Sequence, residues 1–308
     1  MAPDNSFLVT GAAGFVGSCL TRRLIEEGKR VYAFVKPGSD NWRLKDIQNR
    51  LDILVGDLTD QVFVFNTVKK ISPTVIYHLA THGAYASQDE PQKIFNTNIL
   101  GTWNLLNALN GIKYKVFINT GSSSEYGFKK VPMKEIDFLE PNSYYAVAKA
   151  AQTLLCQHFA RAQKKPICTF RLFSVYGFYE EPTRLVPTLI RSCIKGEDLN
   201  MVQPNTARDF VFVGDVVDAY LKIDRLSQLS GEIINIGSGI QTGLKDVVKV
   251  ILELTKAKVK VHWGKMPARS WDTNIWQGDV SKAKKILGWK ARTSLREGLR
   301  KTIQWFRK

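Results

Sequence analysis

The stretch Phe7-Leu-Val-Thr-Gly-Ala-Ala-Gly-Phe-Val-Gly17 decides the fold, because it joins an apolar strand to a glycine-rich turn and a helix. Three of its residues are glycines in the spacing G-x-x-G-x-x-G: Gly11, Gly14 and Gly17. Glycines at such a turn let the backbone bend sharply and let its N–H groups approach a bound anion. The helix that follows begins with Phe15 and Val16 and turns the positive end of its dipole to the same point. The pattern predicts a turn that binds the pyrophosphate of a dinucleotide.

Apolar strands alternate with helical patterns from this turn onward. The predicted strands are 7–10, 30–35, 51–55, 74–78, 114–119 and 167–171, and the predicted helices are 15–28, one from 61, 91–109 and 143–162. This alternation predicts an α/β fold with a doubly wound parallel sheet. We expect a dinucleotide-binding Rossmann domain over residues 1–172, with later strands around 209–235 returning to it. Residues 173–308 then form most of a smaller, mixed α/β substrate domain.

The chain has 308 residues, of which 44% are hydrophobic and 23% charged, as in globular proteins. No run of about 18 apolar residues occurs, so we predict no membrane-spanning helix. The first residues lack the basic and apolar regions of a secretion signal. The cysteines lie far apart in the sequence: Cys19, Cys156, Cys168 and Cys193. Reduced thiols in a cytoplasmic protein are the simplest interpretation, and we expect no metal site, because neither cysteines nor histidines have ligand spacing.

The formal net charge is +16, from 44 Lys and Arg against 28 Asp and Glu. Residues 241–308 hold 17 of the basic residues and 5 of the acidic ones, so most of the excess lies there. A basic surface attracts anionic substrates, nucleic acids or acidic proteins. A solvated lysine-rich face is the simpler interpretation. Because the segment lacks the regular interleaving of aromatic residues typical of single-strand binding, we disfavour a nucleic-acid partner.

The second predicted strand ends in Phe34-Val-Lys36-Pro-Gly-Ser39, where the ribose of a dinucleotide would be recognised. An acidic residue there accepts a hydrogen bond from the 2′-hydroxyl of NAD, whereas a cation suits the 2′-phosphate of NADP. Lys36 stands in this place, and Ser39 or Arg43 could assist it. The sequence therefore favours NADP(H). NAD(H) is the alternative, in which Lys36 is a solvated loop residue and Asp40 takes the role of the acid.

A second polar cluster follows the strand at 114–119. Ser122 lies just beyond that strand, and Tyr145 and Lys149 lie four residues apart on one face of the next predicted helix. An ammonium group beside a phenol lowers the pKa of the phenol from about 10 toward neutrality. Tyr145 is therefore a candidate proton donor or acceptor for interconverting a hydroxyl group and a ketone, and Ser122 would hydrogen-bond the same oxygen.

With these motifs the sequence resembles the extended short-chain dehydrogenase/reductases of the nucleotide-sugar epimerase/dehydratase family. The resemblance covers nearly the whole chain. It implies further cofactor contacts in three segments: Asp57-Leu58, the strand-end segment His78-Leu79-Ala80-Thr81, and Asn98-Ile-Leu-Gly-Thr102. It also implies that Asn98 braces the active-site helix and that Lys149 binds the cofactor ribose. A four-helix interface of the family, formed by the helix at 143–162 and the helix before it, implies a homodimer.

The resemblance implies a nucleoside-diphosphate sugar as the substrate. The residues that we expect to reach it are His82, Ser123, Ser124, Ser174, Arg208 and Arg269. Arg208 and Arg269 match two arginines of the family that bind the diphosphate, for which the planar guanidinium is well suited. Ser174 stands where the family usually has asparagine, so the sugar contacts of this chain differ there.

The resemblance implies one of three reactions: 4-keto reduction, 4-epimerisation or 4,6-dehydration. Family dehydratases place acidic residues where this chain has Ser123 and Ser124, which disfavours dehydration. Epimerases keep a tightly held NAD whereas reductases exchange NADPH, so Lys36 favours a reductase. We therefore expect an NADPH-dependent reductase of a 4-keto(-6-deoxy) sugar with Tyr145 as proton donor. The alternatives are an NAD-dependent 4-epimerase and, from another class, a non-catalytic binding protein with a basic C-terminal surface.

Overall fold

The computed structural model describes residues 6–85, 87–267 and 273–307, which divide into two compact units. Unit 1 comprises the residues up to Gly127 together with Phe138–Arg171 and Tyr220–Ile234. Unit 2 comprises Phe128–Asp137, Leu172–Ala219 and the residues from Asn235 onward. The chain passes between the units several times, so neither unit is one continuous segment.

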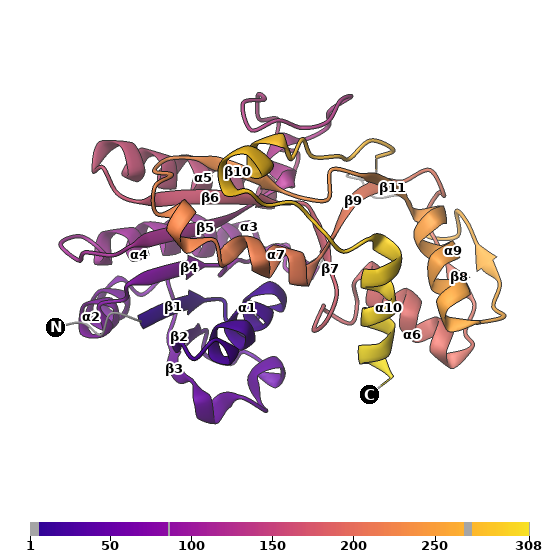
Figure 1. Ribbon diagram of the computed structural model, residues 1–308, viewed down its shortest axis with the longest axis horizontal. Helices are drawn as coiled ribbons and strands as arrows, with labels where there is room; N and C mark the ends of the chain where they lie inside the picture. The colour runs from indigo at the N-terminus through magenta and orange to yellow at the C-terminus, as the bar shows by residue number, and fades with distance from the viewer. Residues whose placement is uncertain (1–5, 86, 268–272, 308) are drawn as a thin grey trace. The chain divides into compact units, whose positions relative to one another are not determined.

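Unit 1 is built on a seven-stranded sheet in the order β10-β6-β5-β4-β1-β2-β3, which Figure 1 shows from top to bottom. Its strands are β1 (Ser6–Thr10), β2 (Arg30–Val35), β3 (Asp52–Val55), β4 (Val75–His78), β5 (Val116–Ser122), β6 (Ile167–Leu172) and β10 (Ile233–Ile236). β1 pairs in parallel with β2 and β4, β2 with β3, and β4 with β5. The strand order reverses at β1 and β4, where a doubly wound sheet opens a crevice at its carboxyl edge. The expected Rossmann sheet is confirmed.

Helices connect these strands. They are α1 (Phe15–Glu26), α2 (Gln61–Ile71), α3 (Pro91–Phe95), α4 (Gly101–Ala108), α5 (Tyr144–Ala162) and α8 (Ile223–Leu226), with short 3₁₀ turns at Trp42–Leu44, Gln48–Arg50 and Ser123–Tyr126. Side chains cap two of them: Asp60 accepts a hydrogen bond from Phe63 N, and Ser143 accepts one from Ala146 N. The expected continuous helix over 91–109 is wrong in one respect, because a π-helical turn at Asn96–Leu100 separates α3 from α4.

The core of unit 1 consists of apolar side chains on the strands and on the helices that cover them. Leu8, Ile76 and Phe117 on neighbouring strands are completely buried, as are Val64 and Leu105 on α2 and α4. Near-continuous apolar strands are typical of a parallel sheet covered on both faces. This packing fixes the carboxyl edge of the sheet, where the candidate site lies.

Unit 2 contains two small sheets and four longer helices among its described residues. The sheets have the orders β11-β9-β7 and β12-β8. The elements are β7 (Ser174–Tyr176), α6 (Leu185–Lys195), β8 (Leu199–Asn200), β9 (Ala207–Phe212), α7 (Val213–Tyr220), β11 (Gln241–Gly243), α9 (Leu244–Thr255), β12 (Val261–His262), a π-helical turn at Ala283–Leu287 and α10 (Leu295–Phe306). Of the later strands expected to return to the large sheet, β10 does so, whereas β9 pairs with β7 and β11 instead.

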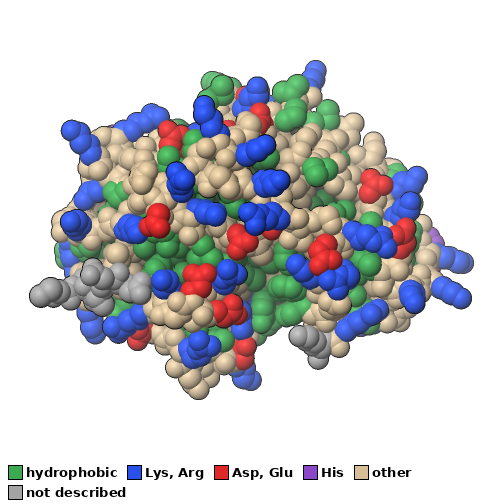
Figure 2. Space-filling model, viewed as in Figure 1, with side chains coloured by type: hydrophobic (Ala, Val, Ile, Leu, Met, Phe, Trp, Pro, Cys, Tyr) green, Lys and Arg blue, Asp and Glu red, His purple; other side chains and the backbone are tan. Residues whose placement is uncertain are grey.

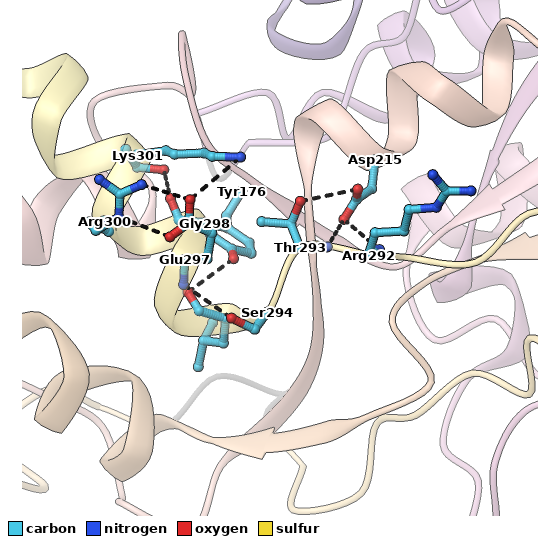
Figure 3. Close-up of polar contacts among 11 residues, drawn as sticks. Tyr176, Asp215, Arg292, Thr293, Ser294, Glu297, Gly298, Arg300 and Lys301 are labelled. Atoms are coloured by element: carbon cyan, nitrogen blue, oxygen red, sulfur yellow. Dashed lines mark hydrogen bonds and ion pairs between the residues drawn. The ribbon is translucent and has the colours of Figure 1, made fainter.

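Asp215 anchors the approach to α10 within unit 2. Its carboxylate accepts hydrogen bonds from Arg292 N (3.2 Å), Thr293 N (2.9 Å) and Thr293 Oγ1 (3.1 Å), as Figure 3 shows. The helix then begins at the N-cap Ser294, which accepts a hydrogen bond from Glu297 N. A buried carboxylate with several donors holds a loop firmly, so the start of α10 is set by one side chain.

The surface is basic without a single basic patch on the face that is drawn. Figure 2 shows Lys and Arg side chains spread over that face, with Asp and Glu side chains between them. Within the described ranges, no helix is long and apolar enough to cross a bilayer. The same residues contain no group of His, Cys, Asp and Glu that could hold a metal ion.

Candidate functional site

The glycine turn has the close backbone approach that a dinucleotide site requires. Gly11 has a φ of +68°, and a Cβ built on it would lie 2.7 Å from Ala80 N. A Cβ on Gly17 would lie 2.2 Å from Gly11 O. Gly14 is the N-cap of α1 and provides no side-chain cap, so the first N–H groups of the helix are left for another acceptor. The turn and the helix start therefore fit the pyrophosphate of a dinucleotide.

The segment after β4 is held beside this turn by a buried hydrogen-bond network. His78 lies between Thr10 and Thr102, with Nδ1 2.7 Å from Thr10 Oγ1 and Nε2 2.8 Å from Thr102 Oγ1. Burial lowers the pKa of His78, so the ring is neutral and links β1, β4 and α4. Thr10 also accepts a hydrogen bond from Ala80 N. The predicted cofactor segment Leu79-Ala80-Thr81 thus lies directly against the glycine turn.

Asn98 is buried and holds the loop after β4 through three hydrogen bonds. Its side chain accepts hydrogen bonds from His82 N (2.9 Å) and Thr81 Oγ1 (3.1 Å) and donates one to His82 O (2.8 Å). These bonds fix the loop after β4, and the π-helical turn that carries Asn98 packs against α5. Burial, together with the positive charges of Lys36 and Lys93, lowers the pKa of His82.

The loop after β4 lies against Tyr145. A Cβ built on Gly83 would come within 3.3 Å of Tyr145 Cδ2, and the φ of Gly83 is +92°. Glycine is thus favoured here by its conformation and by the closeness of the ring. The predicted catalytic tyrosine on α5 and the predicted cofactor loop are neighbours in unit 1.

Lys149 is almost completely buried, one helical turn beyond Tyr145. Its Nζ donates to Thr120 O (2.6 Å) at the end of β5 and to Gln152 Oε1 (2.8 Å). Gln152 in turn donates to Asn119 Oδ1 (2.8 Å), so the chain of hydrogen bonds joins α5 to β5. Burial lowers the pKa of Lys149 to about 8, while the negative charge of Glu125 opposes this effect. The ammonium group is therefore positioned and charged at neutral pH.

The end of β5 carries Ser122, which is nearly buried and begins a short 3₁₀ turn. Its hydroxyl accepts a hydrogen bond from Ser124 N (3.1 Å). Ser123 is buried in the same turn, and Ser124 is partly exposed. All three predicted serines thus lie at the carboxyl edge of β5, the strand that Lys149 contacts.

Glu125 is the acidic residue nearest to these serines, and it points into the core of unit 1. Its carboxylate forms an ion pair with Arg171 Nε at 2.7 Å and accepts hydrogen bonds from Ser122 N (2.8 Å) and Thr153 Oγ1 (3.0 Å). Glu125 is completely buried and Arg171 is 1% exposed. Burial raises the pKa of Glu125, and its bonds to Arg171 and Ser122 oppose this. The carboxylate is committed to the structure and is not presented to a ligand.

The remaining cofactor candidates lie at the carboxyl ends of β2 and β3. Lys36 Nζ is 3.4 Å from Asp57 Oδ2, and both side chains are partly exposed. Burial alone would raise the pKa of Asp57, but hydrogen bonds from Thr59 and the charge of Lys36 outweigh it, so the pKa is lowered. Leu58, the next residue, is buried. The structure brings Lys36 and Asp57 together, because β2 and β3 are parallel neighbours and the two residues follow their carboxyl ends.

The candidates of unit 2 are described separately from those of unit 1. Ser174 lies at the start of β7, partly exposed. Arg208 lies in β9, where its guanidinium donates to Ala207 O (2.7 Å) and stacks 5.4 Å from the ring centre of Trp276. Arg269 lies outside the described residues.

Comparison with known proteins assigns the family. A family model described as GDP-mannose 4,6 dehydratase matches residues 8–302. The chain belongs to this family of nucleotide-sugar epimerases and dehydratases, which are NAD-dependent enzymes of the extended short-chain dehydrogenase/reductase type. A non-catalytic scaffold is therefore not supported.

Three relatives illustrate the similarity. UDP-glucuronate 4-epimerase of Thermodesulfobacterium geofontis is 28% identical over 97% of this chain and 95% of its own length. The structure of UDP-glucose 4-epimerase with UDP-glucose from Thermotoga maritima is 28% identical, with a TM-score of 0.90 over 98% of each chain. UDP-glucuronic acid 4-epimerase from Bacillus cereus, in complex with UDP-glucuronic acid and NAD, is 25% identical, with a TM-score of 0.87 over 98% of this chain and 99% of its own.

These relatives change the expected reaction. All three are named 4-epimerases, so they support the epimerase alternative and give no support to the 4-keto reductase that Lys36 led us to expect. The Bacillus cereus structure holds NAD, and none of the three is described with NADP. A lysine at the ribose position bears on the choice between NAD and NADP and does not by itself determine the reaction, because cofactor preference and reaction type are chemically separable.

Sequence reasoning missed the buried partners of the site. Gln152 lies three residues after Lys149, a spacing that places both on one helical face and could have revealed the pair. The pairing of Glu125 with Arg171 spans 46 residues and joins different elements, so no local pattern signals it.

Proposed function

We propose that this protein is a nucleotide-sugar 4-epimerase that acts on a UDP-hexose or UDP-hexuronate with a retained nicotinamide dinucleotide. The observation that carries the proposal is the burial of Glu125 against Arg171. It leaves Ser122, Tyr145 and Lys149 as a site for proton transfer at a hydroxyl group, without the acidic residues that elimination of water requires. The epimerase names of the relatives support the same reaction.

The bound dinucleotide would supply reversible acceptance and return of hydride at C4 of the sugar. Tyr145 removes the proton of the C4 hydroxyl group and returns it, as general base and then as general acid. Lys149 stabilises the phenolate through its ammonium group, whose pKa burial lowers to about 8. Ser122 holds the C4 oxygen by a hydrogen bond. Inversion follows when the sugar presents its other face before the hydride returns.

The residues at the end of β5 also affect which sugar can bind. Ser123 and Ser124 are neutral hydroxyl residues, which accommodate either a hydroxymethyl group or a carboxylate at C5 of the sugar. Acidic residues in their place would repel a hexuronate. We propose that Arg208 and Arg269 bind the diphosphate and that Ser174 contacts the sugar.

We propose that the enzyme is a cytoplasmic homodimer. Exposed apolar residues gather on neighbouring helices of unit 1: Leu100, Trp103, Tyr144, Val147 and Leu154. On α5, Tyr144, Val147 and Leu154 recur at helical spacing on one face. A contiguous apolar face of this kind is typical of an interface between helices. The four cysteines are free thiols, which suits a reducing compartment.

The experiment is a product analysis. Purified protein with catalytic NAD⁺ or NADP⁺ is incubated with UDP-glucose and, separately, with UDP-glucuronate, and the anomeric protons are followed by NMR. We expect at least one substrate to convert to a mixture with its C4 epimer, without net change in absorbance at 340 nm. Formation of a 4-keto-6-deoxy sugar would show a dehydratase. Reduction of a 4-keto sugar with stoichiometric NADPH consumption, and no epimer, would show a reductase.

A further inference from the structure

We propose that the loop after β2 is a 2′-phosphate site, in which Lys36 and Arg43 select NADP(H) over NAD(H). The inference rests on the proposed function only in taking the ligand to be a nicotinamide dinucleotide. It goes beyond that function because the relatives with a stated cofactor hold NAD. Three observations on unit 1 carry it.

The first observation is the position of Lys36. β1 pairs with β2 over the whole length of β1, with Thr10 opposite Phe34. Lys36 therefore leaves the carboxyl edge of the sheet beside the glycine turn that begins at Gly11. In a dinucleotide fold the adenosine ribose is recognised at this point, by an acid for a 2′-hydroxyl or a cation for a 2′-phosphate. The Lys36 side chain is 56% exposed and pairs with Asp57 at 3.4 Å, so its ammonium group is accessible to a ligand.

The second observation is that the chain brings a second cation back to the same turn. Arg43 Nη1 donates to Ala13 O at 3.3 Å, inside the glycine turn. Its guanidinium also lies 4.5 Å from the ring centre of Trp42. Arg43 is only 6% exposed. A guanidinium fixed in this way presents its donors in one geometry, which suits a phosphate better than a hydroxyl group.

The third observation concerns the carboxylates of this region. Asp40, the residue that could replace the ribose-binding acid, accepts a hydrogen bond from Trp42 N (3.0 Å) and so shapes the 3₁₀ turn that carries Arg43. Asp57 accepts hydrogen bonds from Thr59 N and Thr59 Oγ1 through Oδ1. Its Oδ2 faces Lys36. Asp40 and Asp57 thus bond to the loop backbone, to Thr59 and to Lys36.

The test uses nucleotides that lack nicotinamide, so that its readout is independent of activity. Any dinucleotide retained by the purified protein is first removed, and the protein is then titrated calorimetrically with 2′,5′-ADP and with 5′-AMP, which differ by the 2′-phosphate alone. We expect 2′,5′-ADP to bind at least tenfold more tightly. Lys36→Asp should abolish this difference, whereas Lys113→Asp, the same charge change on an exposed lysine before β5, should preserve it.

Equal binding of the two nucleotides by the unaltered protein would overturn the proposal, as would a Lys36→Asp variant with an unchanged ratio. Arg43→Lys keeps the positive charge but loses the paired N–H donors of the guanidinium. We therefore expect this variant to bind 2′,5′-ADP several-fold more weakly, with little change in its binding of 5′-AMP. Epimerisation is measured on the same preparations. Epimer formation with equal nucleotide binding refutes the 2′-phosphate site alone, and selective 2′,5′-ADP binding without epimer formation refutes the proposed function alone.

Discussion

At the scale of single residues, two adjacent tyrosines at the start of α5 have different surroundings. Tyr144 is 59% exposed, whereas Tyr145 lies against the Gly83 loop and one turn before buried Lys149. Neighbouring positions on a helix point about 100° apart, so only one of the two can face the site. This pair therefore provides both a test of the catalytic assignment and its matched control.

We expect Tyr145→Phe to lower kcat by a factor of about 10² to 10⁴, since it removes the group that transfers the proton. Nucleotide affinity should change little, because the phenolic oxygen is lost and the ring remains. Tyr144→Phe should keep kcat. Steady-state kinetics of the unaltered protein and the two variants measure kcat. Equal losses of kcat in both variants would contradict the assignment of Tyr145 as the proton-transfer residue.

The Glu125–Arg171 pair is expected to be structural rather than catalytic. Glu125→Gln leaves Arg171 buried without a counter-charge, which should reduce the free energy of unfolding by about 3–5 kcal/mol. Asp52→Asn breaks the exposed pair with Arg30, also an Nε-to-carboxylate contact, and should change stability little. Urea unfolding measures both. If Glu125→Gln kept full stability and lost kcat, the carboxylate would belong to the chemistry instead.

At the scale of elements, the parts that follow local rules could be predicted. The glycine turn, the strands of the large sheet and the Tyr145–Lys149 pair all depend on spacing within one or two elements. The π-helical turn at Asn96–Leu100 could not be predicted, because its Asn98 contacts depend on a loop 16 residues away. The same holds for residues 128–137, which belong to unit 2 because Asn235 Nδ2 donates to Met133 O (2.9 Å) and Asn235 N to Glu135.

The attachment of α10 is a further element-scale feature that can be tested. Asp215→Ala removes three hydrogen bonds onto Arg292 and Thr293 and should destabilise unit 2 by about 2–5 kcal/mol. Nucleotide binding by unit 1 should survive under native conditions. Asp246→Ala, at an exposed position on α9, is the control. Unfolding monitored by tryptophan fluorescence should show the loss in Asp215→Ala, and an unchanged transition would show that α10 is held by other contacts.

At the scale of the whole molecule, the apolar face of α5 predicts a dimer. We expect light scattering to give twice the 34.8 kDa mass of the chain. Leu154→Glu places a charge in the middle of this face and should yield a monomer, because burying an unpaired charge is costly. Val62→Glu makes the same change at an exposed apolar position on α2 and should leave the dimer intact. A monomeric unaltered protein would refute the interface.

The central claim is that this enzyme inverts C4 of a nucleotide sugar while keeping the hydrogen of that carbon. The most direct measurement is mass spectrometry and NMR of product formed from the substrate labelled with deuterium at C4, in ordinary water. The account predicts C4-inverted product that retains the deuterium at C4, because hydride leaves and returns to the same carbon without exchange. Loss of the label to solvent, or its transfer to a stoichiometric pool of free dinucleotide, would contradict it.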